Sequence, residues 1–201
     1  MELLYGCPIL EDLQVKLISF DPSDPSSFEG MVKTLPKLAR AHVSSFTYDD
    51  IPLEAFCNVE FLRLDKYCDV NVNNLVFPNL IHMELILGRK FKWSSVLDLL
   101  SHCPQLQTFV LENLHGRDRG WPDSLAVPEC FVSRLWKCVF KNFTGLKGEM
   151  KFAKIVMRNS TSLRTMTICS GPSLFHHQKL EMITELASCP RSSVTCELLF
   201  K

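Results

Sequence analysis

Residues 59–64 read VEFLRL, residues 80–85 read LIHMEL and residues 106–111 read LQTFVL. Each stretch fits the pattern LxxΦxΦ, in which a leucine-like residue precedes two hydrophobic residues by three and five positions. The seven copies are Leu10/Leu13/Val15, Leu38/Ala41/Val43, Val59/Leu62/Leu64, Leu80/Met83/Leu85, Leu106/Phe109/Leu111, Leu135/Cys138/Phe140 and Leu163/Met166/Ile168. Residues two apart share one face of a strand, so each copy predicts a short strand whose last two hydrophobic residues face the core.

The spacing of the copies indicates how the strands are arranged. Successive copies begin 28, 21, 21, 26, 29 and 28 residues apart, which is typical of leucine-rich repeats. One unit cannot cover its own hydrophobic face, so burial requires stacked neighbours. We therefore predict an α/β fold. It is a leucine-rich-repeat solenoid with a short-stranded parallel sheet on the concave side and irregular helices and turns on the convex side.

The segments between the strands predict several short helices. Ser26 with Glu29, and Ser95 with Asp98, fit the spacing of a capping box, and hydrophobic residues follow each pair at helical intervals. Two further helices are expected over residues 149–160 and 178–188. The two 21-residue intervals leave room only for tight turns or a brief 3₁₀ segment.

Proline and glycine gather in residues 116–128, the longest loop-like insertion. This composition places a domain boundary between residues 1–115, which hold the leucine-rich repeats, and residues 121–201. The LxxΦxΦ pattern resumes at Leu135, so we expect the sheet to continue across the boundary.

Composition excludes several functional classes. The 201-residue chain has 22 Lys and Arg against 22 Asp and Glu, so its net charge of zero disfavours nucleic acid and anionic membranes as partners. No apolar stretch reaches the ~20 residues that cross a bilayer. The nine cysteines are odd in number, form no CxxC pair and follow no export signal. We expect an intracellular protein of the cytoplasm, the nucleus or both.

The residues that alternate with the buried positions of each strand predict a concave interaction face. The candidates are Arg40, His42, Phe61, Arg63, Asp65, His82, Glu84, Thr108, Glu112, Lys137 and Lys141. Mixed charge with scattered hydrophobic residues suits a protein ligand. The alternative for any one residue is a solvated cross-strand pair worth ~0.2–1 kcal/mol.

Catalytic and cofactor motifs are absent from the sequence. There is no GxxxxGK[ST], GxGxxG, HExxH or GxSxG, and we predict no enzyme, no cofactor and no metal site. A cysteine-dependent hydrolase is the competing class, since His102 adjoins Cys103. Cys7, Cys103 and Cys189 each precede proline, however, and their setting predicts buried packing residues. His176 and His177 predict a solvated loop, and residues 145–149 predict a turn and not an anion site.

From Trp121 onward the chain resembles a plant family. Trp121 and Pro122, VPEC at 127–130, KNF at 141–143 and CEL at 196–198 resemble the FBD region of plant F-box/FBD/LRR-repeat proteins, over residues 121–201. The earlier repeats, with CPIL at 7–10 and FPNL at 77–80, resemble the leucine-rich portion of the same proteins. In that family an N-terminal F-box binds the adaptor of a cullin-based, SCF-type ubiquitin ligase, and the repeats are taken to select the substrate.

The resemblance implies a non-catalytic protein-interaction module, the substrate-recognition part of such a ligase component, whose partner is a protein substrate of unknown identity. MELLYG at residues 1–6 leads directly into the repeats, so we expect no F-box in this chain. Two alternatives remain open. The chain is an F-box-less regulator or competitor that associates with full-length F-box relatives, or it is a truncated gene product without independent activity.

Overall fold

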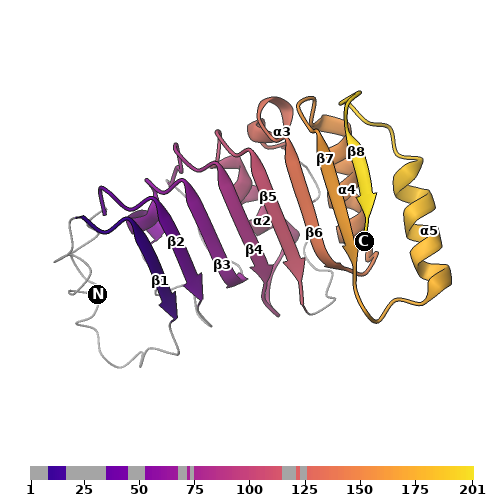
Figure 1. The fold of residues 1–201 in the computed structure, drawn as a ribbon, viewed down its shortest axis with the longest axis horizontal. Coiled ribbons are helices and arrows are strands. Elements are labelled where there is room, and N and C mark those ends of the chain that lie inside the picture. The colour runs from indigo at the N-terminus through magenta and orange to yellow at the C-terminus, as the bar shows by residue number, and fades with distance from the viewer. Residues whose placement is uncertain are drawn as a thin grey trace.

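The computed structural model describes residues 9–16, 35–44, 53–67, 72, 75–114, 121–122 and 126–201. These residues form eight strands in one parallel sheet, and the order of the strands in space equals their order in the chain (Figure 1). The strands are β1 (Asp12–Lys16), β2 (Arg40–Ser44), β3 (Phe61–Tyr67), β4 (His82–Leu87), β5 (Thr108–Asn113), β6 (Lys137–Phe143), β7 (Thr165–Ser170) and β8 (Glu197–Phe200). The predicted α/β class and parallel sheet are therefore confirmed.

The period-two alternation decides which side chains are buried. In β4 the side chains of Met83, Leu85 and Leu87 are fully buried, whereas His82, Glu84 and Ile86 are partly exposed. The last two hydrophobic residues of every copy from Leu38 onward are buried in the same way. Leu10 and Val15 are only partly covered because β1 is an edge strand with a partner on one side.

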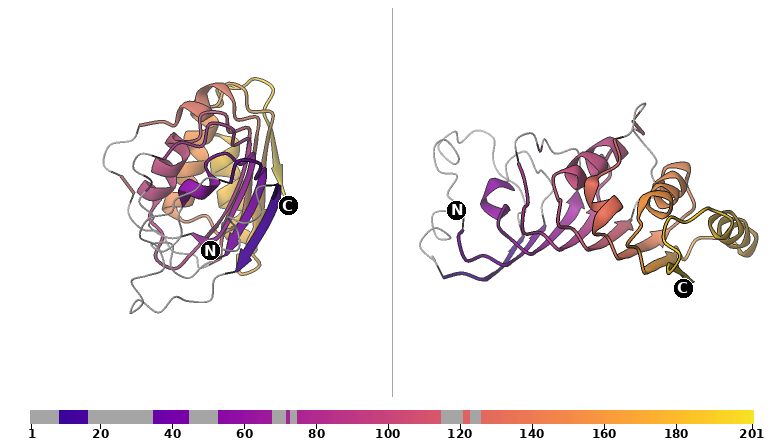
Figure 2. Two further views of the ribbon diagram at one scale, coloured as in Figure 1. Left: turned by 90° about the vertical axis from the view of Figure 1, so that its left-hand side faces the viewer. Right: turned by 90° about the horizontal axis from the view of Figure 1, so that it is seen from above.

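The described helices pack against one face of the sheet, and none of them lies on the other face (Figure 2). They are α2 (Trp93–Ser101), α3 (Glu129–Ser133), α4 (Lys147–Asn159) and α5 (His176–Ala187), with a 3₁₀ segment, η2 (Leu53–Phe56). The 3₁₀ segment lies in one of the 21-residue intervals, as predicted. The helix predicted after Ser26 lies outside the described residues, except for its last residue, Leu35.

The three predicted helices that are described all begin earlier than expected. Helices α4 and α5 begin two residues earlier, and α2 is capped by Lys92, three residues before the predicted cap. Glu149 and Gln178 are the third residues (N3) of α4 and α5. Their side chains accept hydrogen bonds from the backbone N–H groups of Leu146 and Phe175, at 3.2 and 3.0 Å. The start of α2 at Trp93 contradicts the proposed cap at Ser95, which is buried inside the first turn. Burial of Trp93 in the core favours the earlier start.

Only residues 145 and 146 of the predicted turn over 145–149 precede α4, since residues 147–149 form its first turn. A carboxylate from within the helix already occupies this helix end. Gly145 has φ +74°, a conformation that glycine adopts without steric cost. Buried Glu149 accepts hydrogen bonds from the N–H and the hydroxyl of Thr144 and from Nδ2 of Asn113, at 2.9, 3.0 and 2.8 Å. This carboxylate takes the place that an external anion would need.

Phe152 of α4 is the centre of an aromatic cluster between the helices and the sheet. Its ring centroid lies 5.2–6.0 Å from those of Trp93, Phe109, Phe131 and Phe140. These partners come from α2, β5, α3 and β6, so one side chain joins four elements. Aromatic pairs at such distances add to the stabilisation from area burial.

Two elements were not predicted. Strand β8 pairs in parallel with β7 from Glu197 to Phe200. The LxxΦxΦ pattern misses it because Thr195 occupies the position where the other copies carry Leu or Val. Helix α3 is only five residues long, too short to show helical periodicity.

The domain boundary over residues 116–128 stays a prediction. Strands β5 and β6, on either side of it, pair in continuous register from Thr108↔Lys137 to Glu112↔Lys141. Within the described residues, no helix is long and apolar enough to cross a membrane.

Candidate interaction face

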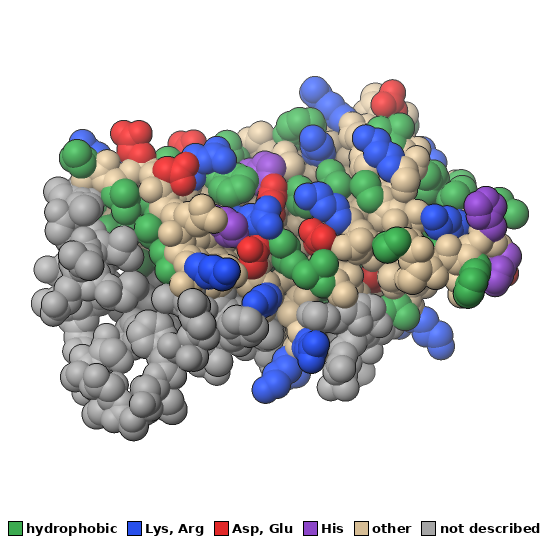
Figure 3. Space-filling view, turned by 60° about the horizontal axis from the view of Figure 1, so that its bottom comes forward, with side chains coloured by type: hydrophobic (Ala, Val, Ile, Leu, Met, Phe, Trp, Pro, Cys, Tyr) green, Lys and Arg blue, Asp and Glu red, His purple; other side chains and the backbone are tan. Residues whose placement is uncertain are grey.

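We call the side of the sheet without helices the open face. All eleven candidate residues lie on it, at alternate positions of β2 to β6. Figure 3 shows acidic, basic and histidine side chains close together over the middle of the molecule. The candidates divide into a connected group on β2–β4 and a looser group on β5 and β6.

The connected group, which we call the β2–β4 network, contains His42, Arg63, Asp65, His82 and Glu84. Nε2 of His42 lies 2.8 Å from Oδ2 of Asp65, and Nε of Arg63 donates to Oδ1 of Asp65 at 2.8 Å. Nη1 of Arg63 donates to Oε2 of Glu84 at 3.2 Å, and Nε2 of His82 lies 3.2 Å from Oε1 of Glu84. Arg63 thus bridges two carboxylates, each of which also contacts a histidine.

Two further candidates border this network. The ring of Phe61 lies 4.8 Å from that of His82, and the guanidinium carbon of Arg40 lies 4.5 Å from the centroid of Phe61. Arg40 also pairs with Asp12 at 3.4 Å, where both side chains are more than half exposed. Such an exposed pair contributes little stability, so Arg40 can rearrange to meet a partner.

The network fixes the charge of its central residues. Burial alone would raise the pKa of Asp65, but the hydrogen bonds from His42 and Arg63 outweigh it and lower that pKa below the ordinary value of 3.8. The hydrogen bond to Asp65 raises the pKa of Arg63 above its ordinary value, although desolvation acts in the opposite direction. Both side chains are about one-fifth to one-third exposed, so a stable pair of charges is presented at the surface.

The β5–β6 candidates are less connected. Thr108 is only 8% exposed, since it lies between His82 and Lys137 in the register, and it offers little contact surface. Glu112 accepts a hydrogen bond from Nδ2 of Asn142 at 2.8 Å. Lys137 and Lys141 form no ion pair within the described part of the chain.

Asn142 was not predicted from the sequence. It has φ +52° and lies where the register between β6 and β7 shifts, and Lys66 at φ +63° marks a similar shift between β3 and β4. Asn tolerates the left-handed region better than most residues, which was the available signal. The bulge turns Asn142 towards Glu112 on the open face.

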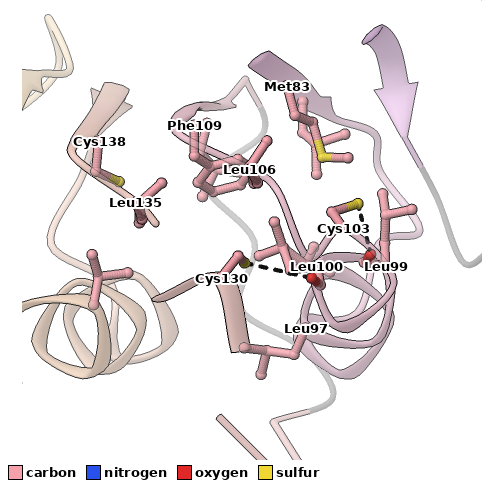
Figure 4. Packing of buried hydrophobic residues seen from close by; sticks show 14 of the residues in the cluster. Met83, Leu97, Leu99, Leu100, Cys103, Leu106, Phe109, Cys130, Leu135 and Cys138 are labelled. Carbon is pink, nitrogen blue, oxygen red and sulfur yellow. Dashed lines mark hydrogen bonds between the residues drawn. The ribbon is translucent and has the colours of Figure 1, made fainter. Parts of the chain in front are cut away.

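Most of the described thiols are buried: Cys103, Cys130, Cys138, Cys189 and Cys196 are covered, whereas Cys57 and Cys169 are partly exposed. Figure 4 shows Cys103 and Cys130 directed to backbone carbonyls of α2; Sγ of Cys103 donates to the Leu99 carbonyl oxygen at 3.2 Å and Sγ of Cys130 to that of Leu100 at 3.6 Å. Burial raises the pKa of Cys103 well above its ordinary value and that of Cys130 to about 12. These thiols are protonated at neutral pH, which is the opposite of what a cysteine nucleophile requires.

His102 and Cys103, which are adjacent in sequence, contact different partners. Nδ1 of His102 lies 2.8 Å from the carbonyl oxygen of Asp98, and Cys103 contacts Leu99 instead. Cys189 is buried as predicted, whereas Cys7 lies outside the described residues. His176 and His177 are exposed but begin α5, so the predicted loop is wrong. Among the described residues, no three His, Cys, Asp or Glu side chains are grouped to hold a metal ion.

This geometry defines a parallel α/β repeat-like protein with a charged sheet face that none of the described helices covers. A family model described as FBD matches residues 123–168. An FBD-associated F-box protein of Arabidopsis thaliana is 30% identical over 98% of this chain and 58% of the relative. A putative FBD-associated F-box protein and an F-box/FBD/LRR-repeat protein, both from Arabidopsis thaliana, are 28% and 29% identical over 85% and 84% of this chain, and 41% and 43% of the relatives.

These matches confirm the predicted family resemblance: residues 123–168 match the FBD model, and the chain is similar to FBD-containing F-box and LRR-repeat proteins of plants. The chain spans about half the length of these relatives. No solved structure matches it.

Proposed function

We propose that this protein is a non-catalytic protein-interaction module, the substrate-recognition part of an F-box, SCF-type ubiquitin ligase component. In this proposal the chain is a leucine-rich-repeat solenoid, its open face is concave, and its partner is a protein substrate inside the cell. The F-box and LRR-repeat names of the relatives support the assignment. The repeated unit of one strand and one return segment, stacked in chain order, supports the solenoid.

The β2–β4 network is the observation that carries the proposal. Its positive and negative groups are held in place by one another before any partner arrives, which reduces the entropy cost of binding. The adjacent Arg40 and Phe61 are of the types enriched at interface hot spots, arginine and aromatic residues. Together they offer a fixed charge pattern beside an aromatic surface, which suits recognition of a folded or extended polypeptide.

The buried thiols support the non-catalytic part of the proposal. A hydrolase built on cysteine would need an accessible thiolate beside histidine. Cys103, the thiol adjacent to a histidine in sequence, is fully buried and donates to a backbone carbonyl.

The test is an affinity capture from plant extract with the tagged chain. One bait is the wild type, and a second carries Arg63→Glu, Glu84→Lys and Lys141→Glu together. A control bait carries Arg89→Glu, Glu181→Lys and Lys147→Glu, which make the same net change of charge at exposed positions outside the open face. Quantitative mass spectrometry compares the proteins that each bait retains.

We expect at least one protein to be retained by the wild type and the control and to be lost from the open-face variant. That protein should then bind the purified wild-type chain directly and should accumulate in plants when the full-length F-box relatives are inactivated. Retention of the same proteins by all three folded baits would contradict the open-face proposal.

A further inference from the structure

A second polar site lies at the edge of the sheet where β5, β6 and β7 begin. It is a pocket of about 410 Å³. Its lining residues are Gln107, Ser133, Arg134, Trp136, Ser162 and Arg164. None of them belongs to the open-face candidates, and none is acidic.

Strand register brings these residues together from distant parts of the chain. Thr108, Lys137 and Thr165 are partners across β5, β6 and β7, so the residue that precedes each of them falls in one row. Those residues are Gln107, Trp136 and Arg164. In the earlier repeats the same row holds Glu60 and Ile81 before β3 and β4, so the basic character is specific to this end of the sheet.

Hydrogen bonds hold the walls of the pocket. The hydroxyl of Ser162 donates to the carbonyl oxygen of Ser133 at 3.1 Å, and that of Thr161 donates to the carbonyl oxygen of Val132 at 2.6 Å. The backbone N–H of Arg164 donates to the carbonyl oxygen of Trp136 at 2.8 Å. The turns that carry both arginines are therefore fixed relative to each other.

The two arginines of the pocket form no ion pair with the described residues. Both side chains, Arg134 and Arg164, are exposed. Arg63 on the open face differs, since it contacts two carboxylates. Two like charges in one pocket repel each other, and an anionic ligand would relieve that repulsion.

We propose that this pocket binds a phosphate monoester. A phosphate carries a charge of about −1.5 to −2 at neutral pH, which matches two guanidinium groups, whereas one carboxylate would leave a positive charge uncompensated. Guanidinium groups recognise phosphate through paired N–H donors. Trp136, 39% exposed, supplies a flat surface for the group that carries the phosphate, and Ser133, Ser162 and Gln107 supply further polar contacts. The site is separate from the open face, and the proposal does not depend on the proposed function.

The test measures the fluorescence anisotropy of a labelled peptide that contains one phosphoserine. The wild type should bind it saturably, more weakly at higher salt, and should not bind the unphosphorylated peptide. Arg134→Gln and Arg164→Gln should each weaken binding about tenfold or more, and the double variant should show no saturable binding. Arg158→Gln, at an exposed arginine outside the pocket, is the matched control and should bind as the wild type does.

Competition identifies the source of the phosphate. Displacement by free O-phosphoserine or inorganic phosphate at the same concentration as the peptide would assign a small free phosphate compound. Displacement only by the phosphopeptide would assign a phosphorylated protein. The proposal would be overturned if none of these probes bound the wild type saturably. It would also be overturned if Arg158→Gln lost as much affinity as the pocket variants.

A measurement on the wild type alone guards against variants that fail to fold. Titration with inorganic phosphate should shift the side-chain Nε–H NMR signals of two arginines and leave the remaining arginine signals unchanged. Uniform small shifts across all arginines would also refute a specific pocket.

Discussion

At the scale of single residues, Asp65 shows how the open face is stabilised. Its two carboxylate oxygens contact His42 and Arg63, at 2.8 Å each. Asp65→Asn removes the charge from both contacts, and we expect a loss of about 1–2 kcal/mol in the free energy of unfolding at pH 7, measured with urea. Asp12→Asn, which removes the exposed partner of Arg40, is the control and should cost almost nothing.

The same substitution predicts a pH dependence. Because the pKa of Asp65 is lowered on folding, its stabilising contribution is present above the ordinary value of 3.8 and is lost as pH falls through the folded-state pKa. The difference in unfolding free energy between the wild type and Asp65→Asn should therefore shrink on acidification below about 3.8. A difference that stays constant down to the acid limit would contradict the assigned pair.

At the scale of elements, Glu149 organises the start of α4. It accepts hydrogen bonds from Leu146, Thr144 and Asn113 while being buried. Glu149→Ala leaves these donors unsatisfied and should lower the free energy of unfolding by about 2–4 kcal/mol. Glu149→Gln keeps one oxygen acceptor and should cost less.

Burial raises the pKa of Glu149 above 4.5, although its hydrogen bonds act in the opposite direction. The folded state then holds the carboxyl proton of Glu149 more tightly than the unfolded chain does. The stabilising contribution of protonated Glu149 is therefore complete below pH 4.5 and declines as pH rises through the folded-state pKa. Urea unfolding at pH 4 and pH 7 measures the free energy of unfolding. The loss that Glu149→Gln causes relative to the wild type should be smaller at pH 7 than at pH 4. A larger loss at pH 7 would show that the carboxylate is the favoured form.

Phe152 joins α4 to the elements around it. Phe152→Ala would leave a cavity among Trp93, Phe109, Phe131 and Phe140, and we expect a loss of about 3–5 kcal/mol in chemical denaturation. Phe152→Leu should cost less because it fills part of the space. Ile155→Ala changes a partly exposed position of the same helix and should lower the free energy of unfolding clearly less than Phe152→Ala does. Equal losses of stability would exclude a central role for the Phe152 ring.

At the scale of the whole molecule, each strand pairs only with its neighbours in the chain. Local opening should therefore begin at an end, where one partner is missing. We expect backbone amides of β8 to exchange hydrogen faster than those of β5, which is paired on both sides. Hydrogen exchange followed by mass spectrometry measures this, and equal protection of both strands would indicate that the sheet opens as a single unit.

Seven of the eight described strands, and the face that each residue takes, can be predicted from the sequence alone. Leu62, Leu64, Met83 and Phe109 are buried as the pattern predicted, because the period of two in a strand leaves only one side for each residue. The family resemblance rested on residues of the C-terminal region and is confirmed by the FBD match at residues 123–168. Three helices are also predictable, although each begins earlier than its pattern indicates. Glu149 and Gln178 are the third residues of α4 and α5, and the cap of α2 is Lys92 in place of Ser95.

Contacts between side chains of different strands, in contrast, require the three-dimensional structure. His42 and Asp65 are 23 residues apart, and Arg63 and Glu84 are 21 apart, so their contacts depend on the register between neighbouring strands. Register likewise places Trp136 beside Arg164 in a pocket that no local pattern indicates. Pairing with β7 also forms β8, although Thr195 breaks the repeat pattern there. Alternation is a property of one strand and can be read along the chain, whereas a site shared by several strands depends on how the return segments set each strand against the next.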